Sequence, residues 1–362
     1  MFRSFLMAMM VLTGLAAQQS LALSEPFPAS PAGTLFASDE ILRIEVQAPL
    51  KELFDKWKHN QNKEPVTGEI SYFDAKGKKV TLTAKFRVKG NSTASMCELK
   101  KIEVKFKKRT TRGTLFDGVK SVDLNTHCRA QADKQGYLYN VHREVVLYRI
   151  AKLLKIPTYQ SRAVLAQYRD TGMVDEDRAE KPFQAAFVED KADILNRLNA
   201  REVKDYDADE FEETKPAPAD SKALYVLHEV EKHPQIDLED FERIALFYIL
   251  TQNFDMDFPT ETINFLPMAR SSLWNLKMIA LSPDKWVPLT HDFNSASAMS
   301  EADVSLTKYE FGWADKSTNE RIRKIFRDNK TAIYKLVDTL GNDQYGKNIM
   351  KKTFDRFFEG GL

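Results

Sequence analysis

The sequence predicts an α+β fold in two lobes, the first rich in strands and the second mainly helical. Three features of this 362-residue chain carry the prediction. Short stretches that alternate apolar and polar residues fill much of the first half, which is typical of half-buried strands. One long helical stretch, Tyr137–Leu154, falls between strands, and the last third of the chain has helical periodicity. Strands followed by helices favour an α+β arrangement, with a crossing point near Glu189.

The N-terminus has the features of an export signal. Arg3 supplies a positive charge, Phe5–Leu15 is apolar but too short to span a membrane, and Ser20–Ala22 offers small residues for cleavage. We expect residues 1–22 to be a signal peptide, with cleavage near Ala17 as the alternative. An uncleaved membrane anchor is the other interpretation. Residues 23–40 are predicted to be an exposed linker, and the mature protein is expected in the periplasm or secreted.

Charge and cysteine content narrow the functional class. The net charge is +1, whereas nucleic-acid and membrane-surface binders usually carry a strong positive excess, so neither partner is expected. No later stretch reaches the roughly 18 apolar residues of a spanning helix. An exported chain with Cys97 and Cys128 favours a disulfide between them, and two buried thiols are the alternative. Two cysteines without a histidine pair at ligand spacing give no zinc motif.

The first lobe, residues 41–188, opens with a strand and the amphipathic helix Leu50–Lys58. Its predicted strands are Ile41–Val46, Gly68–Phe73, Lys79–Val88, Ile102–Phe106, Ser121–Asn125, Arg162–Tyr168 and Phe183–Val188. The helix that begins at Tyr137 carries Glu144 close to its apolar face, although a partly exposed Glu144 fits the pattern equally.

The second lobe, residues 189–362, begins with an acidic segment. Ala200–Lys222 carries two prolines and is interpreted as a solvated insert. Ser317–Glu320 has the sequence of a capping box ahead of a helix at Arg321–Leu340, and a last helix is predicted at Asp343–Phe358.

A series of polar residues follows the apolar helical stretch that ends at Thr251. Asp255 comes four residues later, Asn264 opens the next apolar segment, and the predicted strand Trp286–Thr290 leads to Asp292. A phosphotransferase uses this order for a substrate base and two metal-binding groups. Asp255 capping a turn is the structural alternative, and Asp257 is the rival base.

These residues and several others resemble the spore-coat protein H (CotH) kinase-like family, in its exported bacterial branch. The similarity runs in one order from about Arg87 to Ser297. The matching pieces are Arg87–Asn91, Cys97 with Ile102–Phe106, Thr114–Gly118, Thr126–Cys128, Glu144 with Tyr148–Arg149, Phe187–Asp190, Asn253–Asp255 with Asn264, and Pro288–Phe293. The resemblance implies an atypical protein-kinase-like bilobal fold that binds ATP and Mg²⁺, and in some members transfers phosphate to protein.

The resemblance also implies roles for particular residues. Asp255 would be the catalytic base, and Asn264 with Asp292 would hold the metal. Glu144 would face a phosphate-binding lysine, with Lys105 as the first choice and Lys101 as the second.

The remaining implied contacts concern the nucleotide. Arg87 and Lys89 would approach the phosphates, and Phe187 to Glu189 would form the hinge that reads adenine. The chain departs from its relatives at Met256, where they have Trp, and at Asn294, where many have Asp. We therefore also consider a pseudokinase-like binding module, and an envelope interaction protein that uses its acidic segment. The partners expected are a nucleotide and an unidentified protein acceptor.

Overall fold

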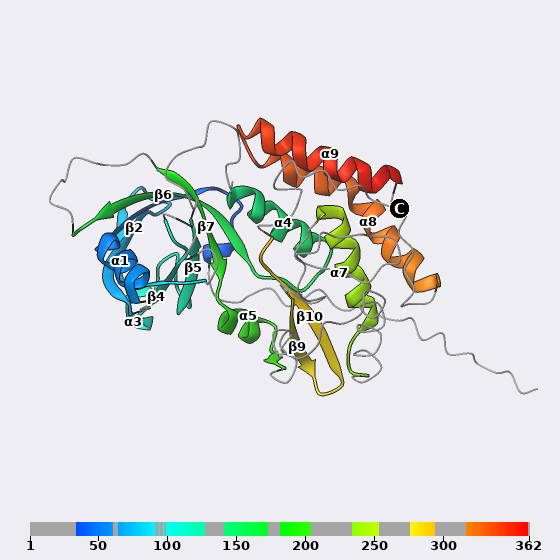
Figure 1. Cartoon of the computed structure of the whole chain (residues 1–362), viewed down its shortest axis with the longest axis horizontal. Coiled ribbons are helices and arrows are strands. Elements are labelled where there is room, and N and C mark those ends of the chain that lie inside the picture. Colours follow the sequence, from blue (N-terminus) through cyan, green and yellow to red (C-terminus); the bar gives the residue numbers. More distant parts are fainter. Residues whose placement is uncertain are drawn as a thin grey trace, which may run out of the picture.

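The structure, a computed structural model, describes most of the predicted strands and helices. It covers residues 34–60, 64–90, 94, 97, 99–126, 141–172, 182–203, 234–252, 276–293 and 316–360. The fold is α+β, with a strand-rich region beside a group of helices, as predicted (Figure 1). Several predicted features lie outside the described residues, namely the signal peptide, Cys128, Asp255, Asp257 and Asn264.

The strand-rich region is a closed barrel. Its strands are β1 (Leu42–Ala48), β2 (Val66–Phe73), β3 (Lys79–Val88), β4 (Ile102–Phe106), β5 (Ser121–Asn125), β6 (Ser161–Asp170) and β7 (Phe183–Glu189). They follow the order β1-β2-β3-β4-β5-β7-β6, and β6 pairs in parallel with β1 to close the ring. Alternate side chains such as Phe86, Val104 and Leu124 fill the interior, so the intervening residues face outward.

Three short helical elements accompany the barrel strands. They are the 3-10 helix η1 (Thr34–Phe36), α1 (Leu50–Asn60) and α3 (Lys108–Thr111). Gly68 lets β1 and β2 approach closely, because a Cβ at this position would lie 2.3 Å from the Gln47 carbonyl oxygen. Cys97, on the segment before β4, is disulfide-bonded. Its predicted partner, Cys128, lies outside the described residues, so the pairing stays a prediction.

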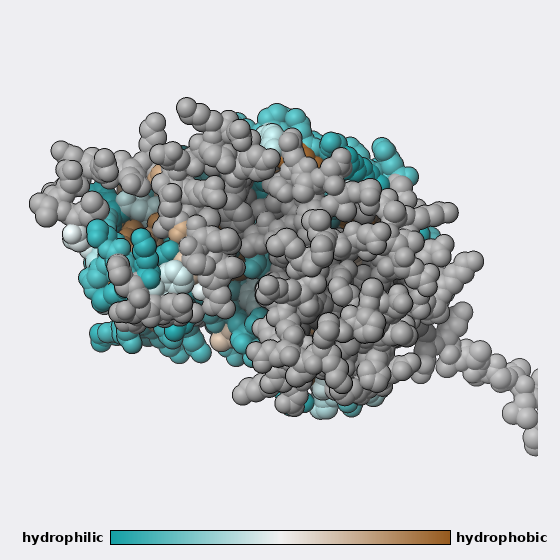
Figure 2. Space-filling model, in the orientation of Figure 1, coloured by the Kyte–Doolittle hydropathy of each residue, from teal (hydrophilic) through white to brown (hydrophobic). Residues whose placement is uncertain are grey.

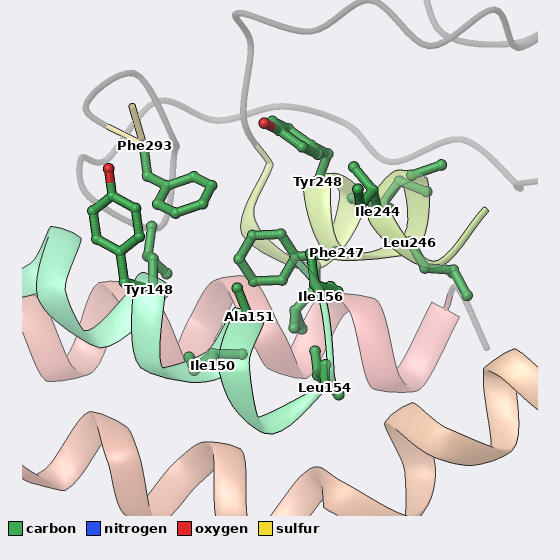
Figure 3. Close-up of a cluster of buried hydrophobic side chains, with 14 of the residues drawn as sticks. Tyr148, Ile150, Ala151, Leu154, Ile156, Ile244, Leu246, Phe247, Tyr248 and Phe293 are labelled. Atoms are coloured by element: carbon green, nitrogen blue, oxygen red, sulfur yellow. The ribbon is translucent and has the colours of Figure 1, made fainter. Parts of the chain in front are cut away.

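Helix α4 (Val141–Leu153) joins the barrel to the helical region. Val141 and Val145 pack on Ala163 of β6 and Ala186 of β7, on the outside of the barrel. The opposite side of α4 belongs to the second core, which also includes α7 (Leu238–Thr251), α8 (Lys316–Asp338) and α9 (Gln344–Gly360). Figure 3 shows this core, where side chains of α4 and α7 meet Phe293.

An ion pair fixes the start of α9 against α4. Arg143 donates to both carboxylate oxygens of Asp343, at 2.8 and 3.1 Å. Gly346 closes this corner, since a Cβ there would lie 2.3 Å from Arg143 Nε. Arg143 is 3% exposed, so the pair is buried and holds α4 in a fixed position beside the barrel.

A three-stranded sheet lies next to the helices. It has the order β10-β9-β8, formed by β10 (Lys285–Thr290), β9 (Leu276–Ser282) and β8 (Arg201–Glu202), and α5 (Lys191–Arg197) precedes it. Two details differ from the sequence predictions. The predicted acidic insert begins with β8, because Arg201 and Glu202 pair with β9. Strand β9 was not predicted.

The predicted capping box is wrong. Helix α8 already includes Lys316, so Ser317–Glu320 forms the first turns of the helix instead of preceding it. Arg321 pairs with Glu239 of α7 at 2.7 Å, which docks this part of α8 on the helical core.

The described surface is mainly hydrophilic. Figure 2 shows hydrophilic residues gathered around the barrel end that carries α1 and along α9. Large apolar side chains that are exposed include Phe73 and Ile41, both on the barrel. Among the described helices, none has the length and hydropathy needed to cross a bilayer.

Candidate functional site

Lys101 lies on the outer face of the barrel where the β3–β4 ladder ends. Its carbonyl oxygen accepts a hydrogen bond from the Lys89 backbone N–H at 2.9 Å, which extends the ladder beyond the two strands. The next residue, Ile102, points into the barrel core, so Lys101 points outward. The side chain of Lys101 is half-buried.

Glu144 on α4 lies on the same side of the barrel. It is 1% exposed, which settles the ambiguity of its helical face in favour of burial. Its carboxylate accepts a hydrogen bond of 3.2 Å from Asn125 Nδ2, and Asn125 ends strand β5. A strand end and a helix therefore fix this carboxylate together.

Asp292 follows β10 in a strained backbone conformation. Its φ is +57°, a region that non-glycine residues seldom adopt. The Asp292 backbone N–H donates to the Tyr148 hydroxyl at 3.2 Å, and the ring of Phe293 packs 4.8 Å from that of Tyr148 and 5.4 Å from that of Phe247 (Figure 3). Tyr148 and Phe247 thus hold the turn in place from α4 and α7. Strain that is fixed by surrounding packing is common at functional sites.

The charged side chains on these elements interact electrostatically with Lys101. Burial lowers the pKa of Lys101, but the charges of Asp123, Asp292 and Glu144 outweigh burial and raise the pKa overall. We call these four residues the Lys101 cluster. Its cation comes from the residue before β4, and its carboxylates come from β5, from α4 and from the turn after β10.

Asp123 is the member of the cluster that the sequence analysis missed. It is 6% exposed and lies on the outer face of β5, between the inward-facing Val122 and Leu124. Burial raises its pKa, while Lys101 and Lys89 act in the opposite direction. Lys89 Nζ lies 2.7 Å from the Asp123 carboxylate and 3.8 Å from that of Asp190. A charged residue inside an apolar strand was the available sequence signal.

His291 and Tyr159 line the same region. Burial, with the positive charges of Lys277, Lys101 and Lys89, lowers the pKa of His291 to about 3. The imidazole is therefore neutral near pH 7 and stands edge-on to the Tyr159 ring at 5.9 Å. The contact with Tyr159 gives His291 a structural role.

The structure separates Lys105 from this cluster. Lys105 is exposed and stands opposite Lys85 on the neighbouring strand. It lies four residues beyond Lys101 along β4, which corresponds to about 13 Å of extended strand. Lys101, the second choice from the sequence, is thus the lysine that lies near Glu144 and Asp292. Strand alternation cannot choose between the two lysines, because both lie on the outer face. Their positions along the strand decide which one lies near the carboxylates.

The other predicted nucleotide contacts have different surroundings. Arg87 pairs across the ladder with Glu103 at 2.7 Å. The Phe187 side chain is fully buried inside the barrel, and its backbone lies between β5 and β6, which leaves no open strand edge there for adenine. The Glu189 carboxylate pairs with Arg197 at 2.8 Å. Strand β7 is thus paired on both sides at Phe187, and the expected adenine contact of Phe187 and Glu189 stays a prediction.

The end of α7 lies beside the strand that leads to Asp292. The hydroxyl groups of Tyr248 and Thr290 are hydrogen-bonded, and Gln252 ends the helix in the left-handed conformation. The sequence correctly predicted that the helix stops there. Asp255 comes three residues after Gln252, a length that spans about 10 Å when extended. The described residues hold no group of three or more His, Cys, Asp or Glu side chains suited to a metal ion.

Comparison with known proteins gives a fold likeness. The structure is similar to the crystal structure of a Helicobacter pylori proinflammatory kinase, CtkA, with 11% sequence identity and a TM-score of 0.42. The likeness covers 81% of this chain and 88% of that one. No protein-family model matches the chain, and no curated protein matches it. At this identity and score no residue correspondence follows, so the function proposed below depends on the site itself.

Proposed function

We propose that this protein is a kinase-like phosphotransferase that binds ATP with Mg²⁺ and transfers phosphate to a hydroxyl group, with a protein as the expected acceptor. The observation that carries the proposal is the Lys101 cluster. Asn125 of β5 holds Glu144, Tyr148 of α4 holds the turn of Asp292, and both carboxylates act on Lys101. Perturbed titratable groups at such a junction mark candidate functional sites. Membership of the CotH kinase-like family is part of the proposal and rests on the ordered motifs in the sequence.

In this proposal, Lys101 binds phosphate oxygens of the nucleotide. Glu144 positions the lysine, and the hydrogen bond from Asn125 orients Glu144 in turn. Lys89 and Arg87 are additional phosphate contacts. Each leaves its present carboxylate partner when phosphate binds. Positioning and charge neutralisation account for most of the catalysis in phosphoryl transfer.

The residues present fit a magnesium ion. Mg²⁺ is usually held by one or two carboxylates together with substrate phosphates and water. The described part of the chain therefore needs to supply only one fixed carboxylate ligand. Asp292 supplies that carboxylate on a turn held by Tyr148. Asn264 is the proposed second ligand. When bound, the ion neutralises charge on the phosphates.

Asp255 is the proposed catalytic base. The acceptor hydroxyl oxygen attacks the γ-phosphorus, and its proton passes to the Asp255 carboxylate. The bond between the γ-phosphorus and the bridging oxygen breaks, and ADP leaves with the electron pair. The nearness of the α7 end to β10 supports this assignment, because it starts the Asp255 segment beside the strand of Asp292.

Nucleotide-dependent thermal stabilisation, measured with and without Mg²⁺, tests the proposal. ATP at about 100 times its Kd should stabilise the wild type by about 2.7 kcal/mol when Mg²⁺ is present. Asp292→Ala should lose this stabilisation and keep its fold. Asp328→Ala is a control, since Asp328 pairs with Lys324 on the exposed face of α8 and is outside the Lys101 cluster. Absence of any nucleotide effect in the wild type would contradict the proposal and favour an envelope interaction protein.

Phosphate transfer separates catalysis from binding. Asp255→Asn should bind Mg-ATP as well as the wild type, yet lose about 10²–10⁴-fold in transfer rate. Asp257→Asn is the matched control. If the 257 variant alone loses transfer, the base is Asp257. If the wild type binds nucleotide without transferring phosphate to any acceptor or to itself, the protein is a pseudokinase-like binding module.

Export is the remaining part of the proposal. We propose that the mature protein begins after Ala22 and acts in the periplasm or outside the cell. N-terminal sequencing of the protein recovered from the periplasmic fraction tests this. Recovery of uncleaved protein from the membrane fraction would instead support the anchor.

A further inference from the structure

A pocket lies against α4, and Lys101 is not among its lining residues. Its volume is about 530 Å³, and it lies among η1, α4, the start of β6 and α8. Small-molecule pockets usually have volumes of about 300–1,000 Å³. The pocket is therefore large enough for an organic ligand.

The lining combines apolar walls with a positive rim. Phe36, Leu153 and Leu336 supply apolar surface from η1, α4 and α8. The exposed Lys152 and Lys335 stand at its edge on the two long helices. Together they would accommodate a molecule with an apolar body and a negatively charged group.

The charge balance supports an anion. The charged lining residues are Arg149, Lys152, Lys335 and Asp39, which leaves a positive excess. Arg149 is already engaged, since its Nε lies 3.1 Å from the Asp39 carboxylate. The two lysines are on different helices and have no ion pair within 4.0 Å among the described residues. Both ammonium groups can therefore attract an anionic group at the pocket rim.

Two tyrosines connect this pocket to the candidate active site. Tyr148 lines the pocket, and its hydroxyl accepts the hydrogen bond from the Asp292 backbone N–H. Tyr159 also lines it, and its ring stands against His291. The same side chains thus form the wall of the pocket and the support of the His291–Phe293 turn.

We propose that this pocket binds an amphipathic organic anion and that its occupancy stabilises the turn that carries Asp292. The apolar part lies against Phe36, Leu153 and Leu336, and the anionic group lies between Lys152 and Lys335. A ligand that fixes Tyr148 reduces the freedom of the hydrogen-bonded Asp292 amide. Two sites that share a positioning side chain are coupled reciprocally in free energy.

Binding of 1-anilinonaphthalene-8-sulfonate, an aromatic monoanion whose fluorescence rises in apolar surroundings, tests the pocket. The folded full chain should bind it saturably with one-to-one stoichiometry. The double variant Lys152→Glu/Lys335→Glu should bind about tenfold more weakly, because two attractive charges become repulsive. Lys352→Glu is the matched control, as this exposed lysine of α9 does not line the pocket.

Ala332→Phe provides a second variant that keeps the rim charges and fills the pocket from α8. It should also weaken binding, while its melting temperature reports whether it folds. Binding that is unchanged in both the charge and the filling variants would overturn the proposed site, as would the absence of saturable binding in the wild type.

Hydrogen exchange at the Asp292 amide tests the connection to the turn. A saturating concentration of the sulfonate should slow exchange at least about twofold in the wild type, since occupancy lowers the frequency of local opening. Tyr148→Phe removes the hydroxyl acceptor, and should abolish this protection. Exchange that is equal with and without the sulfonate would overturn the coupling. Neither measurement uses nucleotide, so failure here is distinct from failure of the proposed kinase-like function.

Discussion

Two partly buried clusters of charged residues in this protein differ in how their charges are paired. The first is the Lys101 cluster. The second, which we call the α7 ion network, consists of Asp237, Glu239, Asp240, Arg243, Lys285 and Arg321. Arg243 pairs with Glu239 at 2.8 Å and with Asp240 at 3.0 Å, and Lys285 pairs with Asp237 at 2.9 Å. In contrast, Lys101 has no ion pair within 4.0 Å in the described part of the chain.

This difference distinguishes a structural network from a candidate site. In the α7 ion network, the carboxylates already meet cations, so it holds α7, α8 and β10 together. In the Lys101 cluster, the carboxylates act on the lysine electrostatically, but none of those in the described part of the chain forms an ion pair with it. An arrangement that leaves the lysine available for a ligand favours function at the expense of local stability.

The largest expected effect is on catalysis at Lys101. Lys101→Met should reduce phosphate transfer at least about 10²-fold, because it removes a preorganised cation from the phosphates. The melting temperature should change little, since the lysine forms no close pair. Steady-state transfer to a generic protein acceptor and a thermal melt measure the two effects.

Lys105→Met is the matched control for that variant. Lys105 is on the same strand and is exposed, so its loss should leave both transfer and stability near wild type. A reversed result, with Lys105→Met inactive and Lys101→Met active, would restore the first choice made from sequence and refute the Lys101 cluster as the site.

Removal of Arg243 should have its main effect on stability. Arg243→Met leaves the buried Asp240 with Lys285 at 3.8 Å, and breaking a buried pair in this way costs about 3–5 kcal/mol. Urea unfolding at pH 7 measures the loss. The double variant Arg243→Met/Asp240→Leu should recover part of it, because no buried charge is then left without its close partner. A single variant as stable as the wild type would show that the α7 ion network is not structural.

The disulfide prediction concerns the segment that leads to Lys101. Lys100 Nζ donates to the carbonyl oxygens of Ala94 and Cys97, at 2.5 and 3.0 Å, so the disulfide-bonded Cys97 lies within this turn. If Cys128 is its partner, a loop of about 30 residues is closed, which contributes about 3–4 kcal/mol. Cys97→Ser/Cys128→Ser should lose this stability. Two titratable thiols in the unfolded, non-reduced wild type would rule out the bond.

The pH dependence of the unfolding free energy should report the raised pKa of Asp240. Burial, which outweighs the nearby Arg243, raises the pKa of Asp240 to about 6, from an ordinary value of 3.8. The folded state then binds the proton more tightly than the unfolded state. This contribution to stability is fully present below pH 3.8 and is lost as the pH rises through about 6. The difference corresponds to at most about 3 kcal/mol.

Asp240→Asn tests this dependence, because asparagine does not titrate. The unfolding free energy of the wild type, relative to the variant, should fall between pH 4 and pH 6.5 and then stay level. A difference that rises over this interval would mean that Arg243 dominates, and that the pKa of Asp240 in the folded protein is lowered.

Local patterning accounts for the parts of the fold that the sequence predicted well. Strands β3, β4 and β5 have the predicted bounds, because strict alternation is visible within each strand. Strand β9 was missed because Met278–Leu281 is a short apolar run without alternation, although Pro283 and Asp284 form the turn that joins it to β10. The start of α8 was misplaced because Ser317–Glu320, which has the sequence of a capping box, lies inside the helix.

The sequence by itself determined the fold class, the end of α7 at Gln252, and the placement of Glu144 and Asp292 on a helix and after a strand. These follow from periodicity and turn chemistry within short segments. Only the tertiary structure decided that Lys101 rather than Lys105 lies near those carboxylates, that Asp123 joins them, and that β7 is paired on both sides in the barrel wall. Each depends on strand register and on barrel closure, which are set by contacts between residues far apart in the chain.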